Sequence, residues 1–300
     1  MSDTTASLRR KIASAGDLQS VVRTMKALAA SNIGQYERSV LALADYTRSV
    51  ELGLGACFRA GATRGRSARR STPAKGRAID AVVFGSDEGL VGRFNDVVAE
   101  RAIRTLATHT GEVRFWAVGE RVSERLADAG VAMAGRFAVP RAAGAITPLF
   151  GQILVVREQR RGDASDASDD ELHLFYNRPA AGAAYATVGQ RLLPLDDAWR
   201  SDLARRPWPE AMLPEVLGDS VAALRAFVRE FLFIALFRAC AESLASENAS
   251  RLEAMQRADK NIDELLESLH GSFHRLRQSD IDEELFDVIA GYEAMSGDVA

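Results

Sequence analysis

Cysteine is scarce in this sequence, and its two cysteines are not arranged for chemistry. Among 300 residues only Cys57 and Cys240 occur, far apart and outside any CxxC motif. This usage argues against structural disulfides and indicates a reducing compartment. We expect both thiols to pack as small buried hydrophobic groups.

Long apolar runs are missing as well. The most apolar stretch, 226–237, is shorter than the ~20 residues that span a bilayer, and it carries Arg229 and Glu230. The opening residues, MSDTTASLRRK, lack the apolar segment of a signal peptide. We therefore expect a soluble chain with no direct membrane insertion.

An excess of one charge sign is lacking too. The formal net charge of −3, with 26% charged residues, gives no general attraction to nucleic acids or acidic membranes. The segment 59–77 is an exception, since it is rich in Arg and contains no acidic residue. It has no interleaved aromatic residues, so we interpret it as a flexible basic linker and expect no nucleic-acid partner. An acidic protein partner is the alternative.

Proline is absent from the first 57 residues and from about Leu217 to Met295, where a helical period takes its place. One heptad series in the first segment consists of Leu8, Ala15, Val22, Ala29, Tyr36, Leu43 and Val50, and a second series is interrupted at Gln19, Lys26 and Thr47. In the last segment Met255, Ile262, Leu269 and Leu276 are also seven apart. The helix predicted for the first segment would be ~70 Å or more long, and a helix of that length needs a partner helix. We predict an antiparallel coiled coil of the two terminal helices.

Between these helices the pattern of apolar and polar residues changes from a helical period to short alternating segments. The new pattern predicts a strand at 79–85, a helix at about 95–108, a strand at 113–118, and helices at about 120–129 and 147–158. The segments ELHLFYNRP and AYATVGQRLLPLD predict a closing pair of strands. This alternation indicates a Rossmann-like α/β domain at 78–207, inserted between a coiled-coil helix at 1–58 with its linker at 59–77 and a second coiled-coil helix at 208–300.

A glycine-bearing loop, GSDEGLVGRFN, follows the first predicted strand, where many α/β proteins bind a phosphate. Its spacing is not GxGxxG, and Asp87 and Glu88 would repel an anion. We interpret the loop as a tight strand-to-helix turn in which Asp87 or Asn95 caps the following helix. A nucleotide site there is the weaker alternative.

Other candidates for chemistry are few. His270 and His274 lie four apart on one helix face, but the glutamate of HExxH is missing and the chain has only four histidines. We expect them to be solvated, and no Ser-His-Asp or Cys-His arrangement is recognisable. The sequence thus predicts no catalytic residue, no metal site and no cofactor.

Three stretches, taken together, resemble one family. The opening helix carries Met25 and Lys26 followed by Ala-Ala-Ser, and the loop SDEGLVGRFN keeps the family's pattern at Ser86, Asp87, Gly89, Gly92 and Asn95. The segment ESLASENASRLEAMQRADKN matches through Glu247, Arg251 and Met255, and RQSDIDEELFDVIAGYEA is similar to the family's last stretch. The chain resembles, over nearly its whole length, the gamma subunit of F-type ATP synthases. Departures such as Asp282 for the usual Thr suggest a divergent branch, as in the alternative, sodium-linked ATPases.

The resemblance implies a non-catalytic rotor subunit in the central stalk. Its partners would be three alpha and three beta subunits, epsilon and the c-ring of the membrane sector, on the cytoplasmic face of a bacterial inner membrane. Met25, Lys26, Arg277, Gln278 and Asp282 would then contact the surrounding ring as a bearing. Two other functions stay open at this point: a Rossmann-like nucleotide-binding enzyme and a coiled-coil adaptor.

Overall fold

The computed structural model describes residues 4–63, 78–161, 170–212, 214–215 and 218–297. Most of the basic linker at 59–77 thus lies outside the described residues. The chain divides into two compact units, one of 29–251 and one of 1–28 with 252–300. Each unit is described separately below, and two long helices, α1 (Thr5–Ala42) and α7 (Ser220–Gly297), contribute residues to both.

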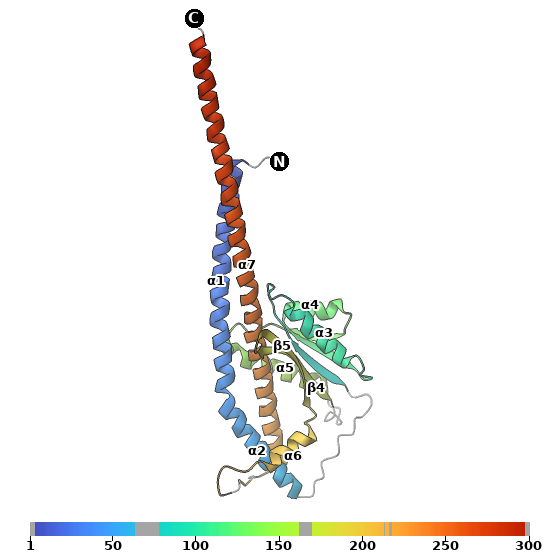
Figure 1. The fold of residues 1–300 in the computed structure, drawn as a ribbon. Helices are drawn as coiled ribbons and strands as arrows, with labels where there is room; N and C mark the ends of the chain where they lie inside the picture. The colour runs from blue at the N-terminus through green and yellow to red at the C-terminus, as the bar shows by residue number, and fades with distance from the viewer. Residues whose placement is uncertain (1–3, 64–77, 162–169, 213, 216–217, 298–300) are drawn as a thin grey trace. The chain divides into compact units, whose positions relative to one another are not determined.

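The larger unit is built on one five-stranded sheet in the order β3-β2-β1-β4-β5. Figure 1 labels β4 and β5 of this sheet. The strands are β1 (Ile79–Phe84), β2 (Val113–Val118), β3 (Met133–Phe137), β4 (Glu171–Ala180) and β5 (Ala183–Leu193). Neighbours pair in parallel except β4 and β5, which form the predicted antiparallel closing pair. The strand β3 was not anticipated by the sequence pattern, since it is short and only half-buried.

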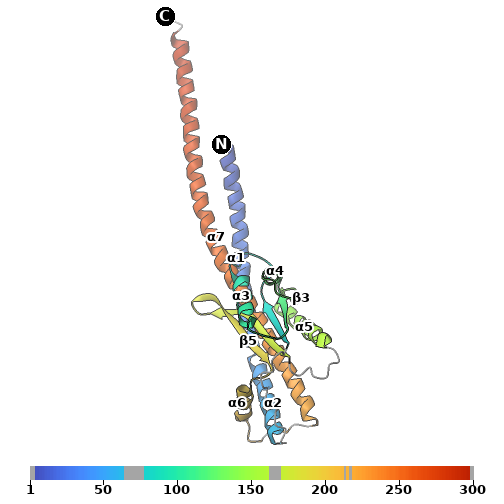
Figure 2. The same cartoon turned by 90° about the vertical axis from the view of Figure 1, so that its right-hand side faces the viewer.

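Helices cover both faces of this sheet, as a mostly parallel sheet requires. On one face α3 (Phe94–Leu106) and α4 (Glu120–Asp128) pack against Ala81 and Val83. On the other face α5 (Ile146–Arg161) and the 220–251 part of α7 pack against Val82 and Phe84 (Figure 2). Because every side chain of β1 is buried, the strand reads as a continuous apolar run interrupted only by Asp80.

The N-terminal helical segment is interrupted where the heptad pattern predicts one helix. α1 ends at Ala42 and α2 (Ala44–Thr63) begins after a turn at Leu43, whose amide donates to the Val40 carbonyl at 3.2 Å. No glycine or proline marks the position. Leu43 is half-buried, whereas Tyr36 and Val50 of the same heptad series are buried.

Two short helical elements complete the larger unit. The helix α6 (Asp197–Arg205) is capped by Asp196, whose carboxylate accepts hydrogen bonds from the amides of Ala198 and Trp199. The 3-10 turn η1 (Ala143–Ala145) precedes α5. The buried Leu203 of α6 joins Leu54 of α2 in a small apolar cluster. The helix α6 is therefore packed against α2.

The smaller unit is an antiparallel pair formed by the first part of α1 and the last part of α7. The pairing runs from Arg9 over the Phe273 ring to Lys26 beside Asp259, so the residue numbers rise on one helix as they fall on the other. Buried residues recur every seven positions on both helices: Leu8, Ala15 and Val22 on α1, and Met255 and Ile262 on α7. The predicted coiled coil is confirmed.

Candidate functional site

The loop after β1 is fixed by a buried side-chain pair. The Asn95 carbonyl oxygen accepts from the Ser86 amide, and its amide nitrogen donates to the Ser86 hydroxyl, each at 2.9 Å. Gly85 leaves the space that this pair needs, because a Cβ there would lie 2.5 Å from the Asn95 oxygen and 2.4 Å from Val122. The turn predicted from the sequence therefore exists, and Asn95 closes it.

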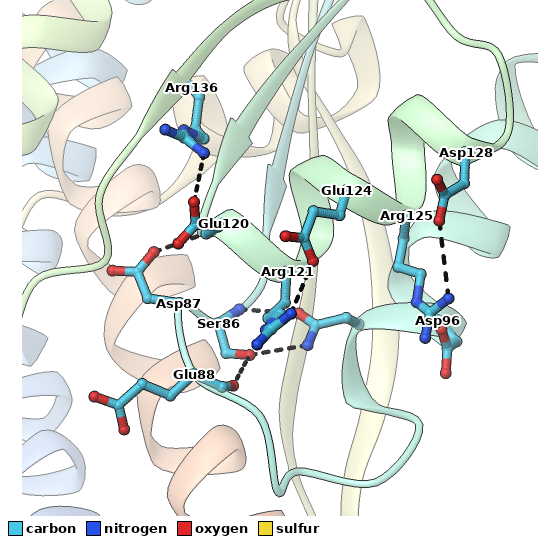
Figure 3. Close-up of polar contacts among 11 residues, drawn as sticks. Ser86, Asp87, Glu88, Asp96, Glu120, Arg121, Glu124, Arg125, Asp128 and Arg136 are labelled. Carbon is cyan, nitrogen blue, oxygen red and sulfur yellow. Dashed lines mark hydrogen bonds and ion pairs between the residues drawn. The ribbon is translucent and has the colours of Figure 1, made fainter.

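Asp87 also acts as a cap, but on another helix than expected. One carboxylate oxygen accepts from the Glu120 amide at the start of α4 at 2.9 Å (Figure 3). The other accepts from the Val139 amide, also at 2.9 Å. The following helix, α3, begins at Arg93 with no side-chain cap. The expectation that Asp87 caps the following helix is therefore wrong. Its negative charge instead suits the positive end of the α4 dipole.

The glycines of the loop have different roles. Gly92 has φ +58°, in the left-handed region that residues with a side chain rarely adopt. Leu90 lies in the same region, with φ 62°, so its backbone is strained. Gly89 has open space around it and no positive φ. The Leu90 side chain is 60% exposed, so the loop presents an apolar group to solvent at a position of backbone strain.

A pocket of about 310 Å³ lies beside the loop, lined by Leu90, Asp96, Arg121, Arg125 and neighbouring residues. Its two guanidinium groups are already paired, Arg121 with Glu124 at 3.1 Å and Arg125 with Asp96 at 2.7 Å (Figure 3). A phosphate would have to displace carboxylates to reach these cations. The pocket is thus poorly suited to a nucleotide.

A second polar pocket, of about 240 Å³, lies where the loop meets the helices of the larger unit. Its wall contains Tyr36 of α1, Asp87 and Glu88 of the loop, and Glu247 and Arg251 of α7. The Arg251 guanidinium donates to one Glu247 oxygen at 2.8 Å, and both side chains are almost buried. Burial raises the pKa of the Glu247 carboxyl to about 7; Arg251 opposes that rise and the charges of Asp87 and Glu88 add to it.

The smaller unit contains a cluster of charges at its helix–helix contact. The Asp259 carboxylate accepts from Lys26 at 3.0 Å and from Arg23 at 3.2 Å, and Gln19 contacts both Asp259 and Asp263. Gln19 and Lys26 are two of the positions that interrupt the second heptad series. The bearing residue Lys26 of the resemblance therefore has a partner within the chain, and a signal for this cluster was already present in those interruptions.

The other residues that the resemblance predicts as bearing contacts lie apart from this cluster. Arg277, Gln278 and Asp282 are exposed on the last part of α7. This part of the helix also exposes an apolar set, namely Ile281, Leu285, Phe286, Val288 and Ile289. Met25 is half-buried and packs with Val22 and the buried Met255. The structure therefore brings Met25 and Lys26 to one helix contact but leaves Arg277, Gln278 and Asp282 on a separate, solvent-facing surface.

The remaining predictions concern single residues. Both cysteines are free and buried, as expected, and burial raises the pKa of each thiol. His270 and His274 are exposed with ring centroids 6.5 Å apart, which confirms them as surface residues. In the part of the chain that the structure describes, no three His, Cys, Asp or Glu side chains are grouped to hold a metal ion. Nor does any described helix offer a stretch apolar and long enough to span a membrane.

Comparison with known proteins gives a consistent match to one family. A family model described as ATP synthase matches residues 4–295. The ATP synthase gamma chain of Clavibacter sepedonicus is 27% identical over 296 residues, and the match covers 96% of each chain. The ATP synthase gamma chain of Anaeromyxobacter sp. strain Fw109-5 is 26% identical, and the match covers 96% of this chain and 98% of the relative. Among solved structures, a chain of the Euglena gracilis mitochondrial ATP synthase has a TM-score of 0.60 at 17% identity, covering 99% of this chain and 96% of its own. A chain of the Tetrahymena thermophila central stalk and c-ring has 0.56 at 20%, covering 79% of this chain and 99% of its own.

Proposed function

The chain belongs to the ATP synthase family, in which its full-length relatives are gamma chains, and we propose that it works as the central-stalk rotor of such an enzyme. The observation that carries this proposal is the combination of a terminal helix pair with one inserted α/β domain, matched over residues 4–295. It is a non-catalytic subunit, because the catalytic sites of this enzyme lie on beta.

The rotor couples by contact rather than by chemistry. An asymmetric shaft inside a ring of three equivalent sites touches each site differently, so it favours a different conformation at each one. Rotation exchanges these preferences, and ion flow is thereby linked to ATP synthesis or hydrolysis. The partners are three alpha and three beta subunits, epsilon and the c-ring, in keeping with the central-stalk and c-ring assemblies to which the fold is similar.

The exposed end of α7 is the part of the described chain best suited to contact such a ring. Its apolar residues, among them Leu285 and Phe286, are 56% and 70% exposed. Arg277, Gln278 and Asp282 lie on the same stretch and supply polar contacts, each worth ~1 kcal/mol or less when exposed. Weak contacts of this kind form and break as the shaft turns. Met25 and Lys26 contribute to the bearing through the helix pair.

We place the assembled enzyme at a membrane, with this chain peripheral to it on the cytoplasmic face of a bacterial plasma membrane. Bacterial relatives such as those of Clavibacter and Anaeromyxobacter support this location. The coupling ion is chosen in the membrane subunits, and a sodium-linked branch is proposed from the departures noted above.

Co-purification and nucleotide binding test the function. The chain is co-expressed with the alpha and beta chains of its own organism, and ATP hydrolysis by the purified complex is measured. We expect a stable complex that hydrolyses ATP, whereas the chain alone neither binds nor hydrolyses it. Micromolar ATP binding to the isolated chain, lost on replacement of Gly92 by a bulky residue, would favour the nucleotide-binding enzyme. A complex without ATPase subunits would favour the adaptor.

A further inference from the structure

Three buried polar atoms without a hydrogen-bond partner follow one row of α7. Within the described residues they are the Ser243 hydroxyl, one carboxylate oxygen of Glu247 and the Nε atom of Arg251. The three residues are four apart, so they lie on one face of the helix. Buried polar atoms are nearly always satisfied, and a row of three marks a place where the molecule carries a cost.

Two members of this row, Glu247 and Arg251, line the second polar pocket. Glu247 and Arg251 form its wall together with Tyr36 of α1, Asp87 and Glu88 of the β1–α3 loop, and Arg141 of the segment after β3. Glu247 lines this pocket and is 6% exposed, while one of its carboxylate oxygens is buried without a hydrogen-bond partner. A proton can therefore reach this carboxyl, while its ionised form is poorly solvated.

The charges that face Glu247 come from every element around the pocket. Arg251 favours the ionised carboxylate, and Asp87 and Glu88 oppose it. Burial raises the pKa of the neighbouring Tyr36 and Cys240, and the negative charge of Glu247 adds to both shifts. Arg141 also lines the pocket and adds a positive charge there. Desolvation is the largest effect, so the neutral carboxyl is favoured up to about pH 7.

The loop that carries Asp87 and Glu88 is attached to the same turn of α7. The Ser250 hydroxyl donates to the Val91 carbonyl at 2.7 Å and so links the loop to the helix. When Glu247 is ionised, its negative charge on α7 repels the negative charges of Asp87 and Glu88 on the loop. Like charges at a shielded site repel more strongly than they would in water.

We propose that Glu247 is a proton-binding switch whose charge sets how firmly the loop at 86–92 is held on α7. With a proton on Glu247 the loop is held closely. Loss of the proton leaves three carboxylates around one pocket, and the loop loosens. The switch acts in the chain itself and does not depend on the role proposed above.

Amide hydrogen exchange on the full-length chain tests this switch. Protection of peptides covering 85–92 is measured at pH 6, 7 and 8, corrected for the intrinsic pH dependence of exchange. In the wild type we expect protection to fall by about tenfold over this range, the size of a coupling of one pKa unit. Glu247→Gln keeps a neutral group of the same shape, so its loop stays protected at all three pH values.

Two further variants keep the test decisive if Glu247→Gln does not fold. Glu88→Gln removes one of the charges that raise the pKa of Glu247, so the fall in protection of the loop shifts to lower pH and becomes smaller. Glu100→Gln changes an exposed residue of α3 and serves as the matched control, with a wild-type profile. Wild-type protection that is flat or rises with pH overturns the proposal. So does a Glu88→Gln profile identical to that of Glu100→Gln.

Discussion

Asp259 of α7 and Lys26 of α1 are joined by an ion pair of 3.0 Å across the helix contact of the smaller unit. Arg23 approaches the same carboxylate at 3.2 Å, and Gln19 contacts it as well. A single carboxylate thus collects three donors from the partner helix. Polar groups at a coiled-coil contact specify the register, because a shift of one helix would separate them.

The first prediction concerns this register. Asp259→Asn removes the charge that three α1 side chains share, so we expect the midpoint of thermal unfolding at pH 7 to fall by a few degrees. Lys260→Ala, which removes a 3.8 Å pair on the solvent face of α7, is the control and should leave the midpoint unchanged. A wild-type midpoint in Asp259→Asn would mean that the apolar heptads alone fix the register.

The destabilisation caused by Asp259→Asn should depend on pH. The hydrogen bond from Lys26 lowers the pKa of Asp259, with Arg23 adding to the effect. The stabilisation is therefore present above the ordinary aspartate pKa of ~3.9 and is lost as the pH falls through the lower pKa of the folded chain. The difference in unfolding midpoint between wild type and Asp259→Asn should shrink as the pH is taken from 7 towards 2.

The second prediction uses two glycines of one loop. Gly85→Ala places a Cβ 2.4 Å from Val122 and 2.5 Å from Asn95, so the free energy of unfolding should fall by roughly 1–3 kcal/mol. Gly89→Ala meets nothing within 4 Å and needs no positive φ, so it should be neutral or slightly stabilising. Urea denaturation of both variants compares them directly. Equal losses in the two would contradict the described turn.

The third prediction tests the layer between the sheet and α7. Leu236 is 1% exposed in the core of the larger unit, and Leu236→Ala should cost about 2–5 kcal/mol of unfolding free energy. Leu41 is 72% exposed, and its replacement by Ala should stay within about 0.5 kcal/mol of the wild type. Denaturant unfolding followed by tryptophan fluorescence gives both values. A small loss at Leu236 would show that α7 does not cover the sheet.

The fourth prediction concerns the continuity of α7 in the smaller unit. Leu265→Pro removes a backbone hydrogen bond inside the helix and costs about 3 kcal/mol or more, with a kink at that point. Leu265 is 50% exposed, so Leu265→Ala serves as the control for the lost side chain. In the assembled enzyme we expect ATP-driven ion pumping to be lost with Pro and kept with Ala. Pumping that survives in Leu265→Pro would argue against a stiff shaft.

Much of this architecture follows from periodicity in the sequence. The strand β2 begins and ends at the predicted residues, and β1, α3 and α4 differ by one or two residues at their ends. Their apolar patterns are strong because both faces of the sheet are buried. The edge strand β3 escaped prediction because it is short and has no clear apolar period. The turn at Leu43 escaped prediction because the heptad series continues through it with no glycine or proline at that position.

The polar sites were harder to predict, because they join residues far apart in the sequence. Asp87 caps α4, whose first amide is 33 residues away, and no local pattern indicates this choice. Asp259 was not anticipated, although Gln19 and Lys26 interrupt a heptad series opposite it. Glu247 was identified only by resemblance. Its unusual environment depends on the loop, α1 and α7 meeting at one pocket.

Rotation of a single assembled enzyme tests the central claim most directly. The two native cysteines are buried, so a cysteine introduced at the exposed Thr108 of the α/β domain can carry a label selectively. With alpha and beta fixed to a surface, a gold particle on this label is followed after ATP is added. The rotor function predicts stepwise rotation in one direction. A complex that hydrolyses ATP while the label stays still, or a chain that does not assemble with alpha and beta, would contradict it.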